Sequence, residues 1–201
     1  MVKYFDSMRT QKKLNKIDLK IIKELNRNPQ STLTDLAEKT GISRPTITTH
    51  LKDLNDEGLL LTQAGVSLRN MNFVTAVVGL EVKPEQSRID SEKYLSECPR
   101  VKMIYRTQGK ANLHVLCWGE NEDTLMATID DFRNMPNTDL ISIMYLGHPV
   151  YGDFVLDFSK QISKESPCGK VVCKECKSFQ NDECLGCPAT LDYKGPLQSF
   201  E

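Results

Sequence analysis

The sequence predicts an α+β protein in three parts, and three observations lead to that prediction. Apolar residues recur every three or four positions over residues 14–61, which is typical of helices. Residues 73–147 alternate between strand-like and helix-like patterns, and five of the seven cysteines lie within 20 residues near the C-terminus. We expect a helical domain over residues 1–70, an α+β domain over residues 71–158, and a cysteine-rich tail over residues 159–201.

The composition is that of a globular protein, with 39% hydrophobic and 26% charged residues. No run approaches the ~18 apolar residues of a membrane span, and no apolar stretch typical of a secretory signal follows the basic N-terminus. We therefore expect a cytoplasmic protein with no membrane partner. Residues 1–70 hold 12 Lys/Arg against 8 Asp/Glu, whereas residues 71–201 hold 14 against 19. The basic half is the one that would attract a nucleic acid, although an excess of this size is weak support by itself.

The first helix is expected to run from Asn15 to Asn26. Ile17 and Ile21 recur at a four-residue step on one of its faces. Asp18 lies in its first turn, where the helix dipole favours a carboxylate. The helix should end at Asn28-Pro29, because a proline disfavours helical backbone in the residue before it.

Residues 33–61 predict two further helices joined by a sharp turn, which is the helix-turn-helix arrangement. The first should end at Gly41, since glycine takes a positive φ without strain. The second should begin at Ser43, a good N-cap, with Pro45 in the first turn, where its missing N–H costs little. The residues expected to pack inward are Leu36, Ala37, Ile42, Ile47, Leu51 and Leu54.

The opposite face of that second helix is small, polar or basic, which suits the major groove of double-stranded DNA. The candidate DNA-binding residues are Ser43, Arg44, Pro45, Thr46, Thr48, Thr49 and Lys52. The alternative is an ordinary three-helix domain whose outer face is merely solvated. Residues 59–70 contain two short apolar runs around Ala64-Gly65, so we expect a hairpin wing from which Arg69 reaches the DNA backbone.

The second domain follows a different pattern, in which strands and helices come in the order β-α-β-β-α-β of the ferredoxin-like fold. Strands are expected at residues 73–82, 101–109, 111–119 and 139–147, and helices at residues 87–97 and 121–135. In the first of these helices, Ile89, Tyr94 and Leu95 should face inward. A last strand at residues 151–158 is expected to extend one edge of the sheet.

One face of this sheet should be open, since both helices pack on the other face. Val74, Val78 and Leu80 are expected on the open face, and they are too apolar to remain in contact with water. On the second strand, one side should carry Val101, Met103 and Tyr105. We therefore expect a homodimer that packs sheet on sheet.

The two domains in this order resemble the Lrp/AsnC (feast/famine) family of archaeal and bacterial transcription regulators. The stretches that carry the resemblance are LNKIDLKIIKEL, LTDLAEKTGISRPTITTHLKDLNDEGLL and RTQGKANLHVLCWG. The first two match the family in phrases, whereas the third matches mainly in pattern. The resemblance implies a dimer through the α+β domain that often assembles to octamers. It also implies binding to pseudo-palindromic promoter sites and, in many members, a small-molecule effector, an amino acid, at an interface between dimers.

The family's turn before the third strand usually reads Gly-x-x-Asp and contributes to effector binding. The resemblance therefore makes Gly109 and Asn112 candidate effector-binding residues. An amide stands at Asn112 where the family usually has a carboxylate, which weakens the case for recognition of an effector's ammonium group. Gly109 can also be an ordinary hairpin glycine.

The tail carries its cysteines as C-x4-C-x2-C-x7-C-x2-C, and the expected metal ligands are Cys168, Cys173, Cys176, Cys184 and Cys187. Two pairs of thiolates at C-x2-C spacing can supply four ligands. The first three cysteines reproduce the plant-type ferredoxin spacing, and Cys187 precedes a proline, as the last ligand of a ferredoxin run does. An iron–sulfur cluster is therefore favoured, for which we expect the 4Fe–4S type, and a tetrahedral zinc site at the last four cysteines is the alternative. Free thiols or a disulfide are the interpretation without a metal.

The leading hypothesis is a sequence-specific DNA-binding transcription regulator that responds to redox state or metal through its tail. No Gly-rich phosphate loop and no paired-carboxylate or Ser-His-Asp arrangement is visible, so we expect no enzyme. Cys98 and Cys117 are expected to be packing residues. Three alternatives remain: such a regulator with a structural zinc and an amino-acid-like effector, an iron–sulfur or thiol oxidoreductase that carries a DNA-binding module, and an architectural DNA-packing protein.

Overall fold

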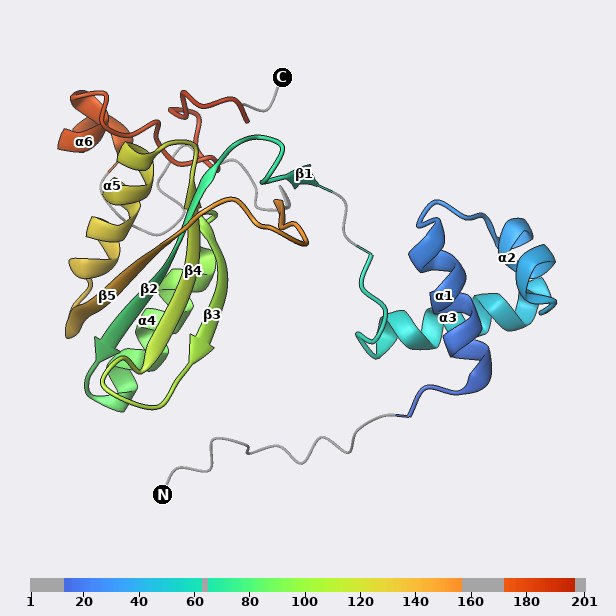
Figure 1. Cartoon of the computed structure of the whole chain (residues 1–201). Coiled ribbons are helices and arrows are strands. Elements are labelled where there is room, and N and C mark those ends of the chain that lie inside the picture. Colours follow the sequence, from blue (N-terminus) through green and yellow to red (C-terminus); the bar gives the residue numbers. More distant parts are fainter. Residues whose placement is uncertain (1–12, 63–64, 157–171, 198–201) are drawn as a thin grey trace. The chain divides into compact units, whose positions relative to one another are not determined.

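The computed structural model describes residues 13–62, 65–156 and 172–197 (Figure 1). The chain divides into two compact units, Met1–Gln63 and Ala64–Glu201, and each is described by itself. The described part of the cysteine-rich tail belongs to the second unit. The division into three domains at residues 70 and 158 stays a prediction. No helix in the described ranges is long and apolar enough to cross a membrane.

The first unit consists of three helices, α1 (Lys16–Arg27), α2 (Leu33–Thr40) and α3 (Arg44–Asp56). Local signals in the sequence set their ends. Capping boxes begin α1 at Asn15 and α2 at Thr32. Gly41 ends α2 in the left-handed region at φ 70°, and the Ser43 hydroxyl accepts a hydrogen bond from the backbone N–H of Thr46 at 3.4 Å. The predicted helix-turn-helix is confirmed.

One small core holds these three helices together. Ile21 of α1, Leu36 of α2 and Ile47 of α3 are almost fully buried against one another. A polar contact also joins α1 to α3, since Nδ1 of His50 lies 2.6 Å from a carboxylate oxygen of Asp18. Partial burial opposes ionisation of Asp18, but its hydrogen bonds with the Asn15 backbone and the His50 ring outweigh burial and lower the pKa of the carboxyl. This packing fixes which face of α3 points to solvent.

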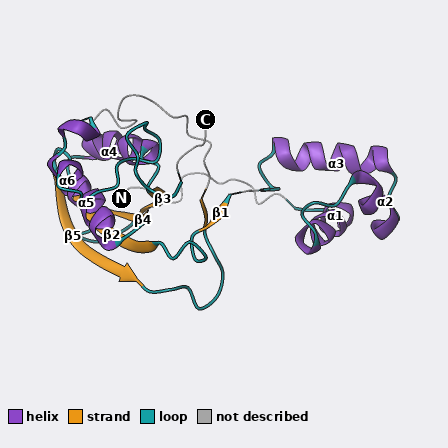
Figure 2. Cartoon of the chain, turned by 90° about the horizontal axis from the view of Figure 1, so that it is seen from above, coloured by secondary structure: helices purple, strands orange, loops and turns teal. Residues whose placement is uncertain are grey.

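The second unit contains a four-stranded antiparallel sheet with two helices on one face (Figures 1 and 2). Its strands are β2 (Val74–Val82), β3 (Val101–Arg106), β4 (Leu113–Gly119) and β5 (Thr138–Leu146), in the order β3-β4-β2-β5. The helices are α4 (Glu85–Glu97) and α5 (Glu122–Arg133). This order of elements is the predicted ferredoxin-like arrangement. Alternate residues of β4, Leu113, Val115 and Cys117, are fully buried beneath the helices.

The open face of the sheet carries apolar side chains, as predicted, but they are not the residues that were predicted. Val78 and Leu80 are fully buried in the core beneath the helices, and Val74 packs against that core. The strand β2 is apolar at nearly every position, so its alternation could not show which set faces the helices. The strand register places a different apolar row across the open face: Met103, Leu116, Val77 and Met144.

Two smaller predictions about side-chain direction were also wrong. Ile89 of α4 is 47% exposed, because the buried face of that helix is formed by Ser91 and Leu95. Val101 does not share a side of β3 with Met103, because an irregularity between them shifts the register. Val101 packs against the core, whereas the Met103 side chain is 40% exposed.

The predicted hairpin wing would pair residues on the two sides of Ala64-Gly65, and in the described residues 59–62 and 65–70 no such pairing is present. The strand β1 (Val66–Ser67) pairs instead with β6 (Val155–Leu156), in a separate two-stranded antiparallel sheet. The predicted last strand therefore does not extend the edge of the larger sheet. The backbone N–H groups of Leu59 and Leu60 both donate to the Leu54 carbonyl, so they complete the end of α3 and take no part in a hairpin.

The small sheet is anchored by a second apolar cluster. Its buried members are Leu68, Phe73, Trp118 and Leu156. The rings of Phe73 and Trp118 are stacked, with centroids 5.2 Å apart and planes 9° apart. Burial of Leu68 in this cluster explains why the segment after residue 64 folds with the second unit.

Candidate nucleic-acid interface and cysteine cleft

The outer face of α3 is the candidate DNA-binding surface. Ile47 and Leu54 anchor the inner face of the helix, which turns the predicted residues outward. The residues exposed on the outer face are Ser43, Arg44, Pro45, Thr48, Thr49 and Lys52. Thr46 is half-buried, and its hydroxyl lies 2.7 Å from that of Ser43, so it supports the cap more than it offers a surface.

The hydrogen bonds and ion pairs that these side chains make within the protein decide which of their groups remain available to a ligand. The hydroxyls of Thr48 and Thr49 donate to backbone carbonyls one turn earlier, at 3.0 and 3.1 Å, which leaves their methyl groups and oxygen lone pairs for a ligand. Among the described residues, no ion pair involves Arg44 or Lys52. The two cations stand about 12 Å apart along the helix. The face can therefore offer one cation near the helix start and another two turns later.

The two candidate effector residues have different surroundings. Gly109 is exposed and takes φ 117°, as a turn glycine does. The Asn112 side chain is engaged by backbone at both ends: Nδ2 donates to the Val82 carbonyl at 2.8 Å, and Oδ1 accepts from the Val82 N–H at 3.0 Å. The amide thus extends the pairing of β2 and β4 past Leu113, the first residue of β4. An effector-binding role for these two residues stays a prediction.

The described cysteines of the tail all line one cleft. Of the first pair, Cys173 begins a 3-10 turn, η1 (Cys173–Glu175), and Cys176 lies between this turn and a short helix, α6 (Lys177–Gln180). The turn from Cys184 to Cys187 carries the second pair. The cleft has a volume of about 860 Å³, and its other wall is formed by α5 and the end of α4. Figure 1 shows α6 beside α5. Cys168 lies outside the described residues. Cys98, predicted as a packing residue, also lines the cleft.

The four described tail cysteines offer sulfur donors to this cleft, and such a donor set would fit a soft metal better than a hard one. The backbone N–H of Gly186 donates to the Cys184 sulfur at 3.4 Å, a contact that stabilises a thiolate. Burial nevertheless raises the pKa of the Cys184 thiol, with the Gly186 N–H and Arg100 opposing the shift. In the described part of the chain, no three Cys, His, Asp or Glu side chains are gathered closely enough to hold one ion. Coordination would require the thiols to close together.

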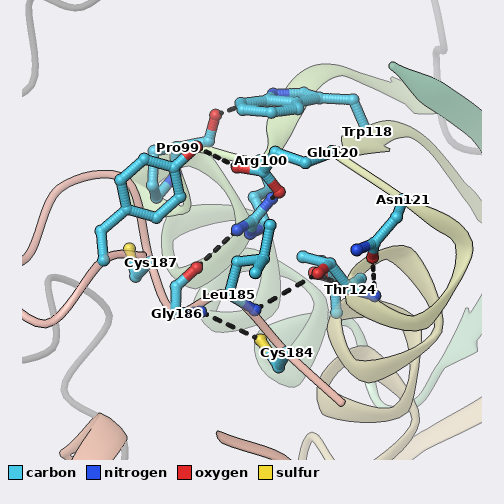
Figure 3. A network of polar contacts seen from close by, with 12 residues as sticks. Pro99, Arg100, Trp118, Glu120, Asn121, Thr124, Cys184, Leu185, Gly186 and Cys187 are labelled. Carbon is cyan, nitrogen blue, oxygen red and sulfur yellow. Dashed lines mark hydrogen bonds and ion pairs between the residues drawn. The ribbon is translucent and has the colours of Figure 1, made fainter. Parts of the chain in front are cut away.

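A buried polar network fastens the second cysteine pair to the α+β fold (Figure 3). The Arg100 guanidinium donates to Glu120 at 2.5 Å and to the Gly186 carbonyl at 2.5 Å, and it lies over the Trp118 ring. Burial disfavours the charged guanidinium, but Glu120 outweighs burial and raises the pKa of Arg100. The Tyr193 hydroxyl donates to the same carboxylate. Sequence reasoning missed this network, because no motif marks an arginine whose partner is 86 residues away.

Known proteins resemble this chain in both its helical unit and its α+β unit. Residues 14–60 match the family described as "Winged helix-turn-helix DNA-binding". The HTH-type transcriptional regulator Ptr1 of Methanocaldococcus jannaschii is 31% identical over 99 residues, which are 48% of this chain and 66% of Ptr1. The chain thus spans just under two thirds of Ptr1. The HTH-type transcriptional regulator LysM of Saccharolobus solfataricus is 24% identical over 122 residues, 61% of this chain and 85% of LysM.

Solved structures show where the fold recurs. A transcriptional regulator of Neisseria meningitidis in complex with L-Met has a TM-score of 0.62 at 18% identity, over 73% of this chain and 98% of that one. The leucine response regulatory protein of Mycobacterium tuberculosis has a TM-score of 0.61 at 18% identity, over 69% of this chain and 96% of that one. This likeness shows that the chain has the α+β fold of Lrp/AsnC structures, with an N-terminal helix-turn-helix domain that matches the winged helix-turn-helix family.

Proposed function

We propose that this chain is a sequence-specific DNA-binding transcription regulator of the Lrp/AsnC type. The observation that carries the proposal is the outer face of α3, which presents two cations and two threonines on a helix-turn-helix whose inner face is fully packed. The winged helix-turn-helix match over residues 14–60 and the likeness to transcription regulators in both units support it.

In this proposal α3 enters the major groove and its two cations have different roles. Arg44, in the first turn, is positioned to bind a guanine edge through its planar fork of donors. Lys52, two turns further along the same face, binds a phosphate and fixes the register without reading a base. Thr48 and Thr49 supply methyl contacts and hydrogen-bond acceptors between them.

The proposed regulator is a homodimer, and a two-fold symmetric dimer would bind a pseudo-palindromic promoter site. The apolar row on the open sheet face, in which Met144 is 62% exposed, favours a second copy of this chain as its cover. Two copies related by a two-fold axis would present two α3 helices, and half-sites would then lie a whole number of helical turns apart. Assembly to octamers follows only from the family resemblance.

The test measures affinity by fluorescence anisotropy on a DNA fragment enriched by selection with the full chain. Arg44→Ala and Lys52→Ala should each weaken binding by about 1–3 kcal/mol, roughly five- to 150-fold. Lys20→Ala is the matched control, because it removes the same charge from an exposed position of α1. Wild-type affinity in both α3 variants at fixed salt would refute the assignment of α3.

We further propose that a cofactor bound by the tail cysteines controls occupancy on DNA. The ligands would be Cys173, Cys176, Cys184 and Cys187, with Cys168 as a fifth thiol. Their spacing and their common cleft support the proposal, and the spacing favours an iron–sulfur cluster over zinc. Such a group would supply a local charge that changes on oxidation or loss, which can bias an assembly and hence its DNA affinity.

The identity of the cofactor is tested by metal and sulfide analysis of the anaerobically purified full chain, with its absorption spectrum. Iron with acid-labile sulfide supports a cluster. One zinc per chain and no iron supports the alternative, a regulator with a structural zinc tail. A chain free of both metals, which also fails to bind added Zn²⁺, would refute the cofactor proposal and leave the DNA-binding proposal standing.

A further inference from the structure

We infer that Arg100 is the residue through which the cysteine cleft is coupled to the DNA-binding unit. The inference rests on the proposed cofactor site and deepens it by naming the side chain that responds when the thiols close on a metal. Arg100 touches no ligand in this account and is a positioning residue. The link it makes runs from the turn between Cys184 and Cys187 to the first described strand of the second unit, β1.

The contact of Arg100 with the cysteine turn is direct. Its Nη2 donates to the Gly186 carbonyl at 2.5 Å, and Gly186 lies between the two cysteines of the second pair. Among the residues that the structure describes, no three thiols are close enough to share an ion, so the two cysteine pairs have to approach one another for a metal to bind. We take the turn from Cys184 to Cys187 to be the part that moves. The Gly186 carbonyl then moves with the turn, and the hydrogen bond transmits that movement to the guanidinium.

Two further contacts hold the same turn and the segment after it against the α+β fold. The backbone N–H of Leu185 donates to the Thr124 hydroxyl at 3.3 Å, at the start of α5. The Tyr193 hydroxyl donates to Glu120. The same carboxylate pairs with Arg100 (Figure 3). A change in the turn is therefore shared between the strand β4, the helix α5 and Arg100.

Because Arg100 is buried, its guanidinium has to move together with its hydrogen-bond acceptors. Its side chain is 5% exposed and that of Glu120 is 3% exposed, so neither charge can exchange its partner for water. A buried charge that loses its partner is strongly destabilising. The guanidinium must consequently follow its acceptors when they move. A site with four thiolate ligands is also anionic, so the cation beside it strengthens the dependence on occupancy.

On its other side Arg100 contacts the cluster that anchors β1. The guanidinium carbon lies 5.2 Å from the centre of the Trp118 ring, and Phe73 stacks on that ring. Leu68 packs in the same cluster and follows β1 directly in the chain. Residues 65–68 are the first described residues after the division between the units at residue 63. A displaced guanidinium thus perturbs the anchorage of the segment that leads from the DNA-binding unit.

Trp118 offers a direct readout, because it is the single tryptophan of the sequence. Zn²⁺ is the probe, since it is redox-inert and its filled d shell absorbs no visible light. The metal-free full chain is titrated with Zn²⁺, bound zinc is counted by elemental analysis, and the emission of Trp118 is followed. In parallel, affinity for the selected DNA fragment is compared with and without Zn²⁺. We expect the emission to change in step with zinc binding and the DNA affinity to change at least about fivefold.

The decisive variant is Arg100→Lys, which keeps the charge but loses the planar fork that binds Glu120 and Gly186 together. We expect unchanged zinc stoichiometry, with the emission change lost and the two DNA affinities within about twofold of each other. Arg106→Lys is the matched control, since it alters an exposed arginine at the far end of β3, the strand that begins directly after Arg100, and both responses should persist. Tyr193→Phe, which removes one hydroxyl from the network, is expected to reduce the emission change if Arg100→Lys does not fold.

The outcomes separate the two proposals. Zinc that binds stoichiometrically to the wild type without altering Trp118 emission would overturn the coupling, while the cofactor site would stand. A zinc-dependent DNA affinity that is equal in the wild type and in a folded Arg100→Lys variant would also overturn it, since Arg100 would then only stabilise the fold. Failure of the wild type to bind any metal would overturn the cofactor site and the coupling with it.

Discussion

Removal of the Asn112 side chain distinguishes a structural role from an effector-binding role for this residue. Both polar atoms of the amide bond to the backbone of Val82, at 2.8 and 3.0 Å, where β2 continues past the first residue of β4. Val82 itself is 1% exposed. Asn112→Ala would therefore leave a backbone N–H and a backbone carbonyl without their present partners, at a site with little access to water.

The expected cost follows from these two bonds. Each hydrogen bond contributes about 1 kcal/mol to stability, and a buried polar group left without a partner costs about 1–3 kcal/mol. Since water can reach part of this half-buried turn, we expect a total loss of about 2–3 kcal/mol. For a domain of this size the loss corresponds to a decrease in Tm of roughly 5–10 °C.

The assay is thermal unfolding of the full chain, followed by circular dichroism. Lys110→Ala is the matched control, because Lys110 is exposed in the same turn and its truncation should leave Tm within about 1 °C. If Asn112→Ala unfolds at the wild-type temperature, the hydrogen bonds to Val82 contribute little and the structural reasoning is refuted. An altered response to amino acids in such a variant would then support the effector role.

Three further predictions concern the sheet face, the first helix and the turn before α3. Met144→Glu places a charge in the apolar row of the open face, and the proposed dimer should dissociate in sedimentation experiments, whereas Val150→Glu, at a position 99% exposed, should leave it intact. Asp18→Asn should cost about 1 kcal/mol at pH 7, because the carboxylate of Asp18 completes a capping box. The lowered pKa of Asp18 means that its contribution is present above about pH 4 and is lost at lower pH, so the two unfolding curves should converge in acid. Gly41→Ala should cost about 1–2 kcal/mol in chemical denaturation, since φ 70° is strained for alanine.

The first unit was predictable because its signals are local. A capping serine, a glycine in the left-handed region and a proline in the first turn each act within a few residues, and they fixed both the turn and the outward face of α3. The order of elements in the second unit was predictable for the same reason, as in Asn121, whose side chain accepts from the Thr124 N–H at the start of α5.

What the sequence could not show depends on pairing between distant residues. The strand β1 pairs with a strand some 90 positions later in the chain, so the local pattern suggested a hairpin instead. A strand that is apolar on both sides, such as β2, does not reveal which set of residues lies under the helices. The cysteine spacing predicted a common site, but the shared cleft with α5 and the hydrogen bond from Arg100 to the Gly186 carbonyl could be seen only in the three-dimensional arrangement.

Reading of DNA bases by α3 is the central claim, and a base-preference profile tests it most directly. Affinity of the full chain is measured for the selected fragment and for every single-base variant of one half-site, with Arg44→Ala and Lys52→Ala beside the wild type. We expect Arg44→Ala to lose discrimination at one guanine position by about 1–3 kcal/mol and to keep the rest of the profile. Lys52→Ala should weaken binding to all DNA sequences alike. It should also reduce the salt dependence of that affinity by about one phosphate contact. An unchanged base profile in Arg44→Ala, together with sequence-independent binding by the wild type, would contradict the claim.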